Sequence, residues 1–320
     1  MPSTLLVTGG CGYLGSRFIR DLAKRSTAPL TIRILDNIRQ GQVRALMDLP
    51  PRVSYELVEG DLLDPSILRL ALEDVDAVIH LAAVVRTPLS YDNPAWLEQV
   101  NHWGTAQLVE ACLAMGIPRL LFASTTAVYG PSGPHDESSS CRPQGPYAHS
   151  KLAAEKVILA ARDRGLEPTI LRLGTLFGLA PITRFDAVAN RFAYLAGVRQ
   201  PLTVYGDGEQ RRPLVHVADA AAAFIQMLGS IPVDPIYNLV GITPSVLEIV
   251  QAVQQTVPTA IIRYVDQDIR THISFAADST KLRATGWQPQ VSLIEGLAEI
   301  INHFSAFRRF MPHLGELDDL

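Results

Sequence analysis

Short apolar runs alternate with amphipathic stretches through the first half of the chain. Six runs rich in Val, Ile and Leu lack polar alternation, which is typical of strands buried on both faces of a sheet. Between the first two runs, Leu14, Phe18 and Leu22 recur at every fourth position, the spacing of one helix face. This alternation predicts an α/β fold, a doubly wound parallel sheet with helices on both faces. The predicted strands are Thr4–Thr8, Thr31–Asp36, Ser54–Val58, Asp76–Leu81, Arg119–Ser124 and Pro168–Leu173.

The pattern changes after about Thr175, where strand candidates become rarer and Pro and Gly mark loops. The run Ile236–Val240 is expected to return to the sheet as an edge strand. Helical patterns follow at Val246–Val257 and Leu293–Phe307. These features predict a sheet domain and a smaller C-terminal α/β lobe that binds the substrate. The expected division assigns residues 1–175 with 214–240 to the first, and residues 176–213 with 241–320 to the second.

Composition excludes several classes of protein. The 320 residues are 48% hydrophobic and 19% charged, which is the balance of a packed globular chain. The formal net charge of −4 gives no electrostatic footprint for duplex nucleic acid, so no nucleic-acid partner is expected. No apolar stretch reaches the ~18 residues needed to span a bilayer, so no membrane association is expected.

The start of the chain and its cysteines predict a cytoplasmic protein. The first residues lack a basic segment and a cleavage site, so they are interpreted as a mature start and not as a signal peptide. Cys11, Cys112 and Cys141 are an odd, scattered set without a C-x-x-C pair. This argues against a disulfide framework or a metal site and for a reducing compartment.

A glycine-rich turn follows the first strand and opens the first helix. Gly9, Gly12 and Gly15 form a G-x-x-G-x-x-G pattern. The first glycine permits a positive φ, the second lets a pyrophosphate approach the backbone, and the third lets the helix pack close to the strand. A diphosphate would rest on the helix N-terminus, where amides and the helix dipole favour an anion. The loop therefore predicts a dinucleotide-binding sheet of the Rossmann type.

Asp36 ends the second predicted strand, at about the distance (~20 residues) from the glycine loop at which a carboxylate binds an adenosine ribose. A carboxylate there accepts hydrogen bonds from the ribose hydroxyls and repels a 2′-phosphate. Arg33 and Arg39 flank this position without replacing the acid. The sequence therefore predicts NAD as the cofactor, in preference to NADP.

Tyr147 and Lys151 are four residues apart in the predicted helix Tyr147–Arg164, so they share one helix face. A free tyrosine has a pKa of about 10, and a nearby ammonium group favours its phenolate. Tyr147 is therefore predicted to exchange a proton with a substrate hydroxyl while hydride moves to or from the nicotinamide. A third polar group is expected at the end of the fifth strand. Thr125 is the leading candidate there, with Ser124 and Thr126 as competitors.

With these motifs in place, nearly the whole chain resembles the extended short-chain dehydrogenase/reductase family, the NAD-dependent epimerases and dehydratases of nucleotide sugars. The resemblance rests on the glycine loop, the Tyr–Lys pair and several further segments in the family's order. These are His80-Leu81-Ala82-Ala83, Ser124 to Gly130, Leu171 to Gly178, Val204 to Gly208 and Thr285 to Pro289.

The resemblance implies further roles around the cofactor. Gly9, Gly12 and Gly15 would hold the NAD pyrophosphate with the amides of Tyr13 and Leu14. Lys151 would also bind the nicotinamide ribose. The remaining cofactor contacts implied are Asp36 and Asn37 at the adenosine ribose, Asp61 and Leu62 at the adenine, and Leu81, Ala82 and Asn101 along the cofactor.

The resemblance also implies a nucleotide-sugar site. Thr203 and Tyr205 lie in the segment that holds the nucleobase, largely through backbone, and Arg212 matches the arginine that binds the diphosphate, with Arg211 as a weaker substitute. Thr175 stands where the family commonly has an asparagine that bonds the diphosphate. A second diphosphate arginine often precedes the final Asp-Ser-x-Lys segment, and only Arg270 is near that position. Thr125 and Thr126 complete the predicted substrate contacts.

The function expected from these observations is epimerisation of a nucleotide sugar, most simply at C4 of a hexose or uronic acid, through transient oxidation to a ketone. The alternatives are reduction of a 4-keto sugar and decarboxylation of a nucleotide-linked glucuronate. A non-catalytic NAD-binding regulator is a further alternative, which the intact Tyr147/Lys151 pair opposes. In dehydratases of this family an Asp and a Glu follow the catalytic threonine, and the decarboxylases keep the Glu. Thr126 and Ala127 occupy those positions, so a 4,6-dehydratase is not expected.

Overall fold

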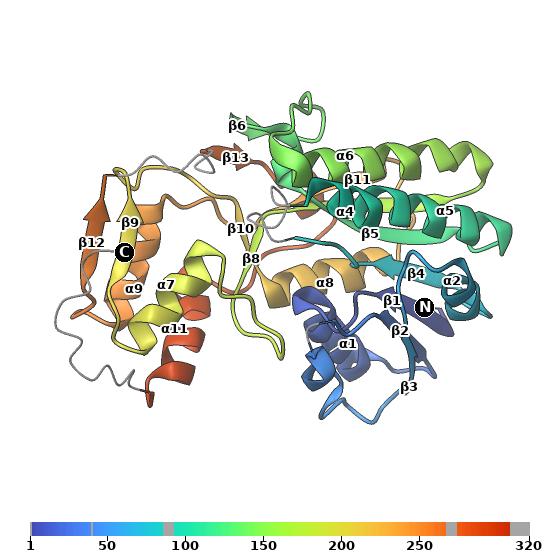
Figure 1. Ribbon diagram of the computed structural model, residues 1–320, viewed down its shortest axis with the longest axis horizontal. Helices are drawn as coiled ribbons and strands as arrows, with labels where there is room; N and C mark the ends of the chain where they lie inside the picture. Colours follow the sequence, from blue (N-terminus) through green and yellow to red (C-terminus); the bar gives the residue numbers. More distant parts are fainter. Residues whose placement is uncertain (1, 40, 86–92, 267–273, 308–320) are drawn as a thin grey trace.

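The computed structural model describes residues 2–39, 41–85, 93–266 and 274–307. Its central element is a seven-stranded sheet in which every pair of neighbouring strands is parallel, in the order β11-β7-β5-β4-β1-β2-β3 (Figure 1). The strands are β1 (Thr4–Thr8), β2 (Thr31–Asp36), β3 (Ser54–Glu59), β4 (Ala77–His80), β5 (Arg119–Thr125), β7 (Glu167–Leu173) and β11 (Ile236–Leu239).

Helices cover both faces of this sheet because its central strands are apolar on both sides. In β1, Leu5 and Val7 pack into the core on one face, and Leu6 packs into the core on the other. The first face is covered by α1 (Tyr13–Arg25) and α8 (Val217–Leu228). The second is covered by α2 (Pro65–Leu72), α4 (Pro94–Glu98), the π-helical turn η2 (Gln99–Trp103), α5 (Gly104–Ala114) and α6 (Gly145–Ala160).

The strand order reverses between β1 and β4, which places a topological switch point beside the glycine turn that follows β1. In open α/β sheets, ligands bind outside the carboxyl ends of the strands at this point. The carboxyl ends of β1, β2, β4 and β5 all lead to predicted site residues. The topology therefore places predicted site residues from distant parts of the sequence at one edge of the sheet.

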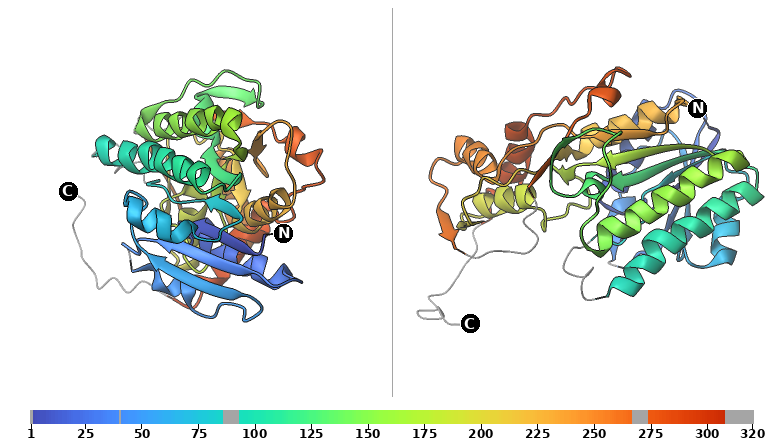
Figure 2. Two further views of the ribbon diagram at one scale, coloured as in Figure 1. Left: turned by 90° about the vertical axis from the view of Figure 1, so that its right-hand side faces the viewer. Right: turned by 90° about the horizontal axis from the view of Figure 1, so that it is seen from above.

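A smaller lobe lies beyond the carboxyl edge of the sheet (Figures 1 and 2). Its core is formed by α7 (Val188–Gly197), α9 (Val246–Thr256) and α11 (Leu293–Phe304), which pack against one another. Strands β9 (Leu202–Tyr205) and β12 (Ile262–Val265) form a parallel pair on this core. Two further parallel pairs connect the lobe to the sheet domain: β8 (Thr175–Phe177) with β10 (Leu214–His216), and β6 (Ser132–His135) with β13 (Phe275–Ala277).

The short elements are the single-turn helices η1 (Gln42–Leu46), η3 (Thr126–Tyr129) and η4 (Ala161–Arg164), and α10 (Thr280–Arg283). The predicted α/β class and parallel sheet are confirmed, and each of the six predicted strands is present within one residue at either end. Among the helices that the structure describes, none combines the length and apolar character that crossing a bilayer requires.

Candidate active site

The glycine turn has the backbone geometry that its three glycines predict. Gly9 has a φ of +69°, and a Cβ atom at this residue would lie 2.6 Å from the amide nitrogen of Ala82. A Cβ at Gly15 would lie 2.4 Å from the Gly9 carbonyl oxygen. Side chains at these two positions would therefore push the turn away from the segment after β4 and push α1 away from the turn.

The N-terminus of α1 is built to receive an anion. Its N-cap residue is Gly12, so no side chain caps the first amides of the helix. The first turn also contains no acidic residue. A Cβ at Gly12 would lie 3.1 Å from the Gly9 carbonyl oxygen, and in dinucleotide-binding turns a glycine at this position lets the pyrophosphate approach the backbone. These features fit the pyrophosphate of a dinucleotide, with the amides and the helix dipole supplying the positive potential.

Asp36 lies at the carboxyl end of β2, next to the glycine turn. Its Oδ2 accepts a hydrogen bond of 3.0 Å from the Cys11 amide, and its Oδ1 accepts one of 3.0 Å from the Ile38 amide. Burial raises the pKa of this carboxyl, and the amide hydrogen bonds oppose the rise. The carboxylate is thereby fixed at the edge of the sheet where the sequence predicts an adenosine ribose.

The next polar cluster contains the residues predicted to lie at the ribose and adenine. Asn37 Nδ2 donates to Asp61 Oδ2 at 3.3 Å, and the Arg39 guanidinium lies 3.5 Å from the same oxygen. The side chain of Leu62 is buried in the core beneath α5. Of the two residues predicted to contact the adenine, only Asp61 therefore has a polar side chain near the surface. Leu62 could contact the adenine only through its backbone.

A chain of hydrogen bonds joins β1 and β4 to the π-helical turn η2. Thr105 Oγ1 donates to the Asn101 carbonyl at 2.7 Å, so the 2.9 Å contact between His80 Nε2 and this hydroxyl requires a proton on Nε2. His80 Nδ1 then accepts from Thr8 Oγ1 at 2.7 Å, and that hydroxyl accepts from the Ala82 amide at 3.3 Å. Burial lowers the pKa of His80 to about 3, so the ring is neutral and serves to hold these segments.

Asn101 lies within η2, and π-helical turns are frequently found at functional sites. Its Oδ1 accepts from the Val84 amide at 2.8 Å, and its Nδ2 donates to the Val84 carbonyl at 3.0 Å and to Ser150 Oγ at 3.2 Å. Asn101 thus ties the segment after β4 to α6, the helix that carries Tyr147. The segment contains Leu81 and Ala82, which are half-buried at the edge of the sheet.

Three hydroxyls at the end of β5 were candidates for the third polar group, and their contacts separate them. Ser124 is buried and donates to a Glu155 oxygen, while Thr126 is buried and donates to the Leu173 carbonyl at 3.2 Å. Thr125 accepts from the Ala127 amide at 3.2 Å, and its side chain also interacts with Tyr147, whose pKa it lowers. Thr125 is therefore the hydroxyl that stands beside the predicted acid/base. The prediction that Thr126 contacts substrate does not fit, because its side chain turns into the protein.

Tyr147 lies in the first turn of α6, and Lys151 lies one turn further along the same face. Burial raises the pKa of Tyr147 to about 12, opposed by the positive charge of Arg184 and by the hydrogen bond with Thr125. Lys151 is buried, at 2% exposure, and its ammonium nitrogen lies 4.2 Å from the centre of the Phe122 ring. Burial lowers the pKa of Lys151 to about 7, and the Glu155 carboxylate acts against this fall.

A buried ion pair between Glu155, one turn after Lys151 in α6, and Arg172 in β7 was not predicted. Glu155 and Arg172 form hydrogen bonds of 2.6, 3.0 and 3.2 Å, and both side chains are at most 5% exposed. Arg172 also donates to the Tyr129 hydroxyl at 2.9 Å. The spacing of Tyr147, Lys151 and Glu155 at every fourth residue was the available signal, because it places all three on one face of the helix.

The predicted substrate residues lie mainly at the junction with the smaller lobe. Thr203 and Tyr205 are half-buried in β9, while the alternate positions of that strand face the core of the lobe. Arg212 is half-buried, and burial lowers the pKa of its guanidinium. Arg211, the weaker candidate, instead lies 3.4 Å from Glu248 and donates to the Thr243 carbonyl at 3.0 Å.

Two predicted substrate contacts remain. Thr175 begins β8 directly beyond the carboxyl end of β7, and its side chain is exposed. Its amide is fixed by a hydrogen bond of 2.7 Å to the Pro213 carbonyl, adjacent to Arg212. Arg270 lies outside the described residues.

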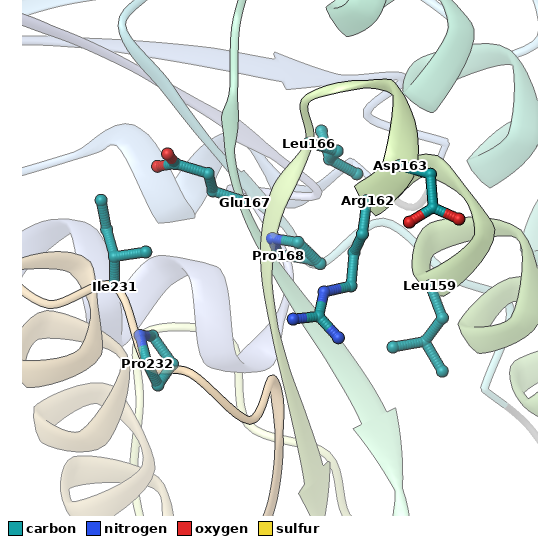
Figure 3. Close-up of a pocket in the computed structure, with 8 residues that line it drawn as sticks. All are labelled: Leu159, Arg162, Asp163, Leu166, Glu167, Pro168, Ile231 and Pro232. Atoms are coloured by element: carbon teal, nitrogen blue, oxygen red, sulfur yellow. The ribbon is translucent and has the colours of Figure 1, made fainter.

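A surface pocket at the other edge of the sheet is separate from this site. Glu167 and Pro168 line it at the amino end of β7, while the predicted site residues gather beyond the carboxyl ends (Figure 3). Arg162 and Asp163 approach it from η4, and Ile231 and Pro232 from the loop after α8 (Figure 3). None of the predicted cofactor or catalytic residues is among the described residues that line it.

The sheet order, the uncapped helix N-terminus behind a glycine turn and the Thr125–Tyr147–Lys151 cluster are together typical of a dinucleotide-dependent oxidoreductase. Comparison with known proteins makes the assignment specific. The chain belongs to the NAD dependent epimerase/dehydratase family, whose sequence model matches residues 5–239.

Relatives within this family carry out different reactions. A dTDP-glucose 4,6-dehydratase from Streptomyces niveus is 29% identical, with 98% of this chain and 96% of that protein covered. The crystal structure of UDP-glucose 4-epimerase from Thermus thermophilus with NAD is similar at a TM-score of 0.83, 30% identity and coverage of 95% and 99%. A Bacillus cereus UDP-glucuronic acid 4-epimerase, with UDP-glucuronic acid and NAD, has a TM-score of 0.83, 26% identity and coverage of 94% and 98%.

The position of Asp36 predicts a preference for NAD over NADP. A 2′-phosphate on the adenosine ribose would bring a second negative charge to this carboxylate, and like charges in contact cost free energy. We expect NADP to bind at least about tenfold more weakly, a difference of about 1.4 kcal/mol. Calorimetric titration of each cofactor measures the two dissociation constants. Asp36→Asn removes the charge but keeps an acceptor oxygen, so it should reduce the difference in affinity between NAD and NADP. Tighter binding of NADP by the wild-type protein would contradict the prediction.

Proposed function

We propose that this protein is an NAD-dependent nucleotide-sugar epimerase that inverts C4 of a nucleoside-diphosphate hexose or uronic acid. The observation that carries the proposal is the cluster of Thr125, Tyr147 and Lys151 with no carboxylate at the two positions after Thr125. This set supports removal and return of hydride at one carbon. A non-catalytic NAD-binding regulator is disfavoured because both members of the Tyr147/Lys151 pair are present.

NAD, when bound, supplies the acceptor that takes hydride from the sugar carbon and gives it back. The residues of this chain handle the proton. Tyr147 takes the proton of the C4 hydroxyl as the ketone forms and returns it to the same oxygen after the sugar has turned. Burial alone raises the pKa of Tyr147, contrary to the lowering expected from Lys151, so the phenolate would have to be favoured by the positive nicotinamide ring together with the Lys151 ammonium group. Thr125 would share the substrate oxygen with Tyr147.

Dehydration and decarboxylation are disfavoured by the turn after β5. Expulsion of water across C5 and C6 needs an acid and a base near those carbons, and a threonine hydroxyl or a methyl group cannot supply them at neutral pH. Thr126 donates to a backbone carbonyl inside the protein, and Ala127 has no proton to transfer. Reduction of a keto sugar and decarboxylation of a glucuronate remain the alternatives to epimerisation.

Carboxylates from other segments are held in contacts of their own. Asp136 accepts hydrogen bonds from Ser138 and Ser139 at the surface. Glu137 accepts from the Asn238 amide at 2.6 Å, and Asp186 lies 2.6 Å from the Arg184 guanidinium. These contacts favour structural roles for all three and support the reading of the site as one without a second acid/base pair.

Arg212 is proposed to bind the diphosphate of the nucleotide sugar, because a guanidinium can form two parallel hydrogen bonds with phosphate oxygens. We expect Arg212→Ala to weaken binding of UDP-glucose by about 1.5–3 kcal/mol, the scale of a hydrogen bond to a charged group. Binding of NAD should be unchanged. Calorimetry with each ligand separates the two effects, and Arg211→Ala is the matched control. Loss of NAD affinity in the Arg212 variant would contradict the assignment of this residue to substrate.

A homodimer through a four-helix seam is proposed as the assembly. Helices α5 and α6 lie side by side on one face of the sheet domain (Figure 1). Leu152 and Val157 of α6 are only half-buried in the single chain, and Trp103 at the start of α5 is 58% exposed. A second copy of the helix pair would cover these apolar side chains.

Product analysis tests the proposed reaction. The protein is incubated with NAD and, separately, UDP-glucose or UDP-glucuronate, and the nucleotide sugars are separated by chromatography. The proposal expects the C4 epimer from at least one of them, with no net change in NADH. Accumulation of a 4-keto-6-deoxy sugar, release of carbon dioxide or stoichiometric formation of NADH would contradict it.

A further inference from the structure

The side chain of Tyr13 extends from the glycine turn into the smaller lobe. Its hydroxyl donates a hydrogen bond to the Gly178 carbonyl, 165 residues away, and accepts one of 2.9 Å from Asn190 Nδ2 in α7. The side chain is 7% exposed, and burial raises the pKa of the phenol, so the group is a neutral donor. The residue whose amide faces the predicted pyrophosphate therefore also contacts the lobe predicted to bind the substrate.

Asn190 fixes the segment from Gly178 to Arg184 at both ends. Its Oδ1 accepts from the Gly178 amide at 2.9 Å, and its Nδ2 also donates to the Arg184 carbonyl at 2.8 Å. Asn190 is fully buried. Gly178 has a φ of +96°, and a Cβ there would lie 1.9 Å from His216 Nε2, so the backbone can take this path only with glycine. The buried Asn190 side chain and the Tyr13 hydroxyl therefore link the path of this segment to the glycine turn.

The last residue of this segment, Arg184, is positively charged and acts on the predicted catalytic tyrosine. The Arg184 guanidinium forms hydrogen bonds of 2.6 and 3.0 Å with the Asp186 carboxylate. The positive charge of Arg184 also lowers the pKa of both Tyr147 and Tyr13. Movement of Gly178 or Asn190 would therefore change the electrostatic environment of the Tyr147 hydroxyl.

We propose that Tyr13, Gly178 and Asn190 couple the cofactor loop to the substrate lobe, so that a dinucleotide bound at the Tyr13 amide orders the segment 178–187 for a nucleotide sugar. Tyr13 and Asn190 act as positioning residues through the backbone of this segment. The inference rests on the proposed function for the identity of the second ligand. The coupling itself requires only that NAD binds at the glycine turn. Because coupling between two ligands is reciprocal, nucleotide-sugar binding must strengthen NAD binding by the same factor.

Hydrogen–deuterium exchange with NAD alone tests the coupling without any turnover. In the full-length wild-type protein, saturating NAD should slow exchange in peptides covering residues 178–190 by at least about fivefold, the lower end of typical coupling. Tyr13→Phe keeps the ring and the amide, so it should bind NAD and protect the glycine turn while losing the protection at 178–190. Asn190→Ala should behave in the same way. Tyr55→Phe is the matched control, since its hydroxyl donates to the Pro50 carbonyl at 2.7 Å within the sheet domain, and it should retain the protection.

Equal protection of 178–190 in wild type and in both variants would overturn the proposal, as would wild-type protein that binds NAD without this protection. UDP serves as the second probe. Its dissociation constant in the wild-type protein should fall by at least about fivefold when NAD is present, and this ratio should approach one in Tyr13→Phe. If UDP does not bind to the wild-type protein at all, the proposed nucleotide-sugar function fails, while the exchange result still decides the coupling.

Discussion

Replacing Tyr147 with phenylalanine is expected to abolish nearly all turnover while NAD binding survives. The substitution removes a single oxygen, which the proposed mechanism uses to take and return the C4 hydroxyl proton. General acid–base groups contribute about 10²–10⁴-fold to rate, so kcat should fall by that factor. Thr125 cannot replace the phenol, because its hydroxyl already accepts from the Ala127 amide and has a pKa far above neutral.

The measurement is steady-state turnover of the identified nucleotide sugar, with NAD affinity measured by calorimetry on the same preparations. Tyr55→Phe provides the control, because it removes a tyrosine hydroxyl outside the site. That hydroxyl donates to the Pro50 carbonyl. Near wild-type turnover in Tyr147→Phe would overturn the mechanism. A large loss of NAD affinity would show that the phenol acts mainly in binding.

The second large effect is expected at the buried ion pair of Glu155 and Arg172. Glu155→Ala leaves the Arg172 guanidinium buried without its carboxylate, and removing one partner of such a pair costs about 3–5 kcal/mol. Unfolding in urea measures the loss. The double variant Glu155→Leu/Arg172→Met should recover part of it, because no uncompensated charge remains. Glu110→Ala is the control: this residue pairs with Arg164 at 2.5 Å on the surface, where the effect should be small.

Loss of Glu155 should also change the pH dependence of catalysis. The Glu155 carboxylate opposes the fall in the Lys151 pKa that burial causes, so its removal should lower that pKa below about 7. Lys151 is charged below its pKa, and therefore the pH above which kcat declines should move to lower values in Glu155→Gln. A purely structural role would reduce stability without moving the profile. An unchanged pH profile together with unchanged stability would contradict both roles assigned to the pair.

Much of the sheet domain could be predicted from local patterns. The strands beside the core are continuous apolar runs, and such runs mark strands buried on both faces with little ambiguity. Gly9 and Gly15 occupy positions where a Cβ would collide with backbone atoms. The glycines in the sequence therefore indicate the close packing of this turn. The short strands that connect the smaller lobe to the sheet domain were harder to predict, because β8, β10 and β13 are only three residues long and show no periodicity.

The site was predictable where spacing along one element determines it and not where contacts join distant segments. Tyr147 and Lys151 follow from an i, i+4 pair, and Glu155 could have been found by extending that spacing by one turn. Sequence alone favoured Thr125 but could not exclude Ser124 and Thr126, because the order of these residues does not reveal which hydroxyl faces the helix.

Contacts between the two lobes had no local signal. Tyr13 and Asn190 are separated by 177 residues, and the tyrosine was predicted only for its amide. The same holds for Arg184, which lies in a loop without regular structure. Such contacts depend on how the smaller lobe docks against the sheet, and side-chain hydrogen bonds across a lobe boundary leave no pattern in either segment alone.

The fate of a deuterium label at C4 distinguishes epimerisation from dehydration of the sugar. UDP-glucose and UDP-glucuronate, each labelled at C4, are incubated with the protein and NAD, and the products are analysed by NMR. An epimerase removes and returns hydride at one carbon, so we expect deuterium at C4 of the inverted sugar from at least one of the two substrates. Deuterium at C6 of a 4-keto-6-deoxy sugar, or loss of carbon dioxide from the glucuronate, would contradict it.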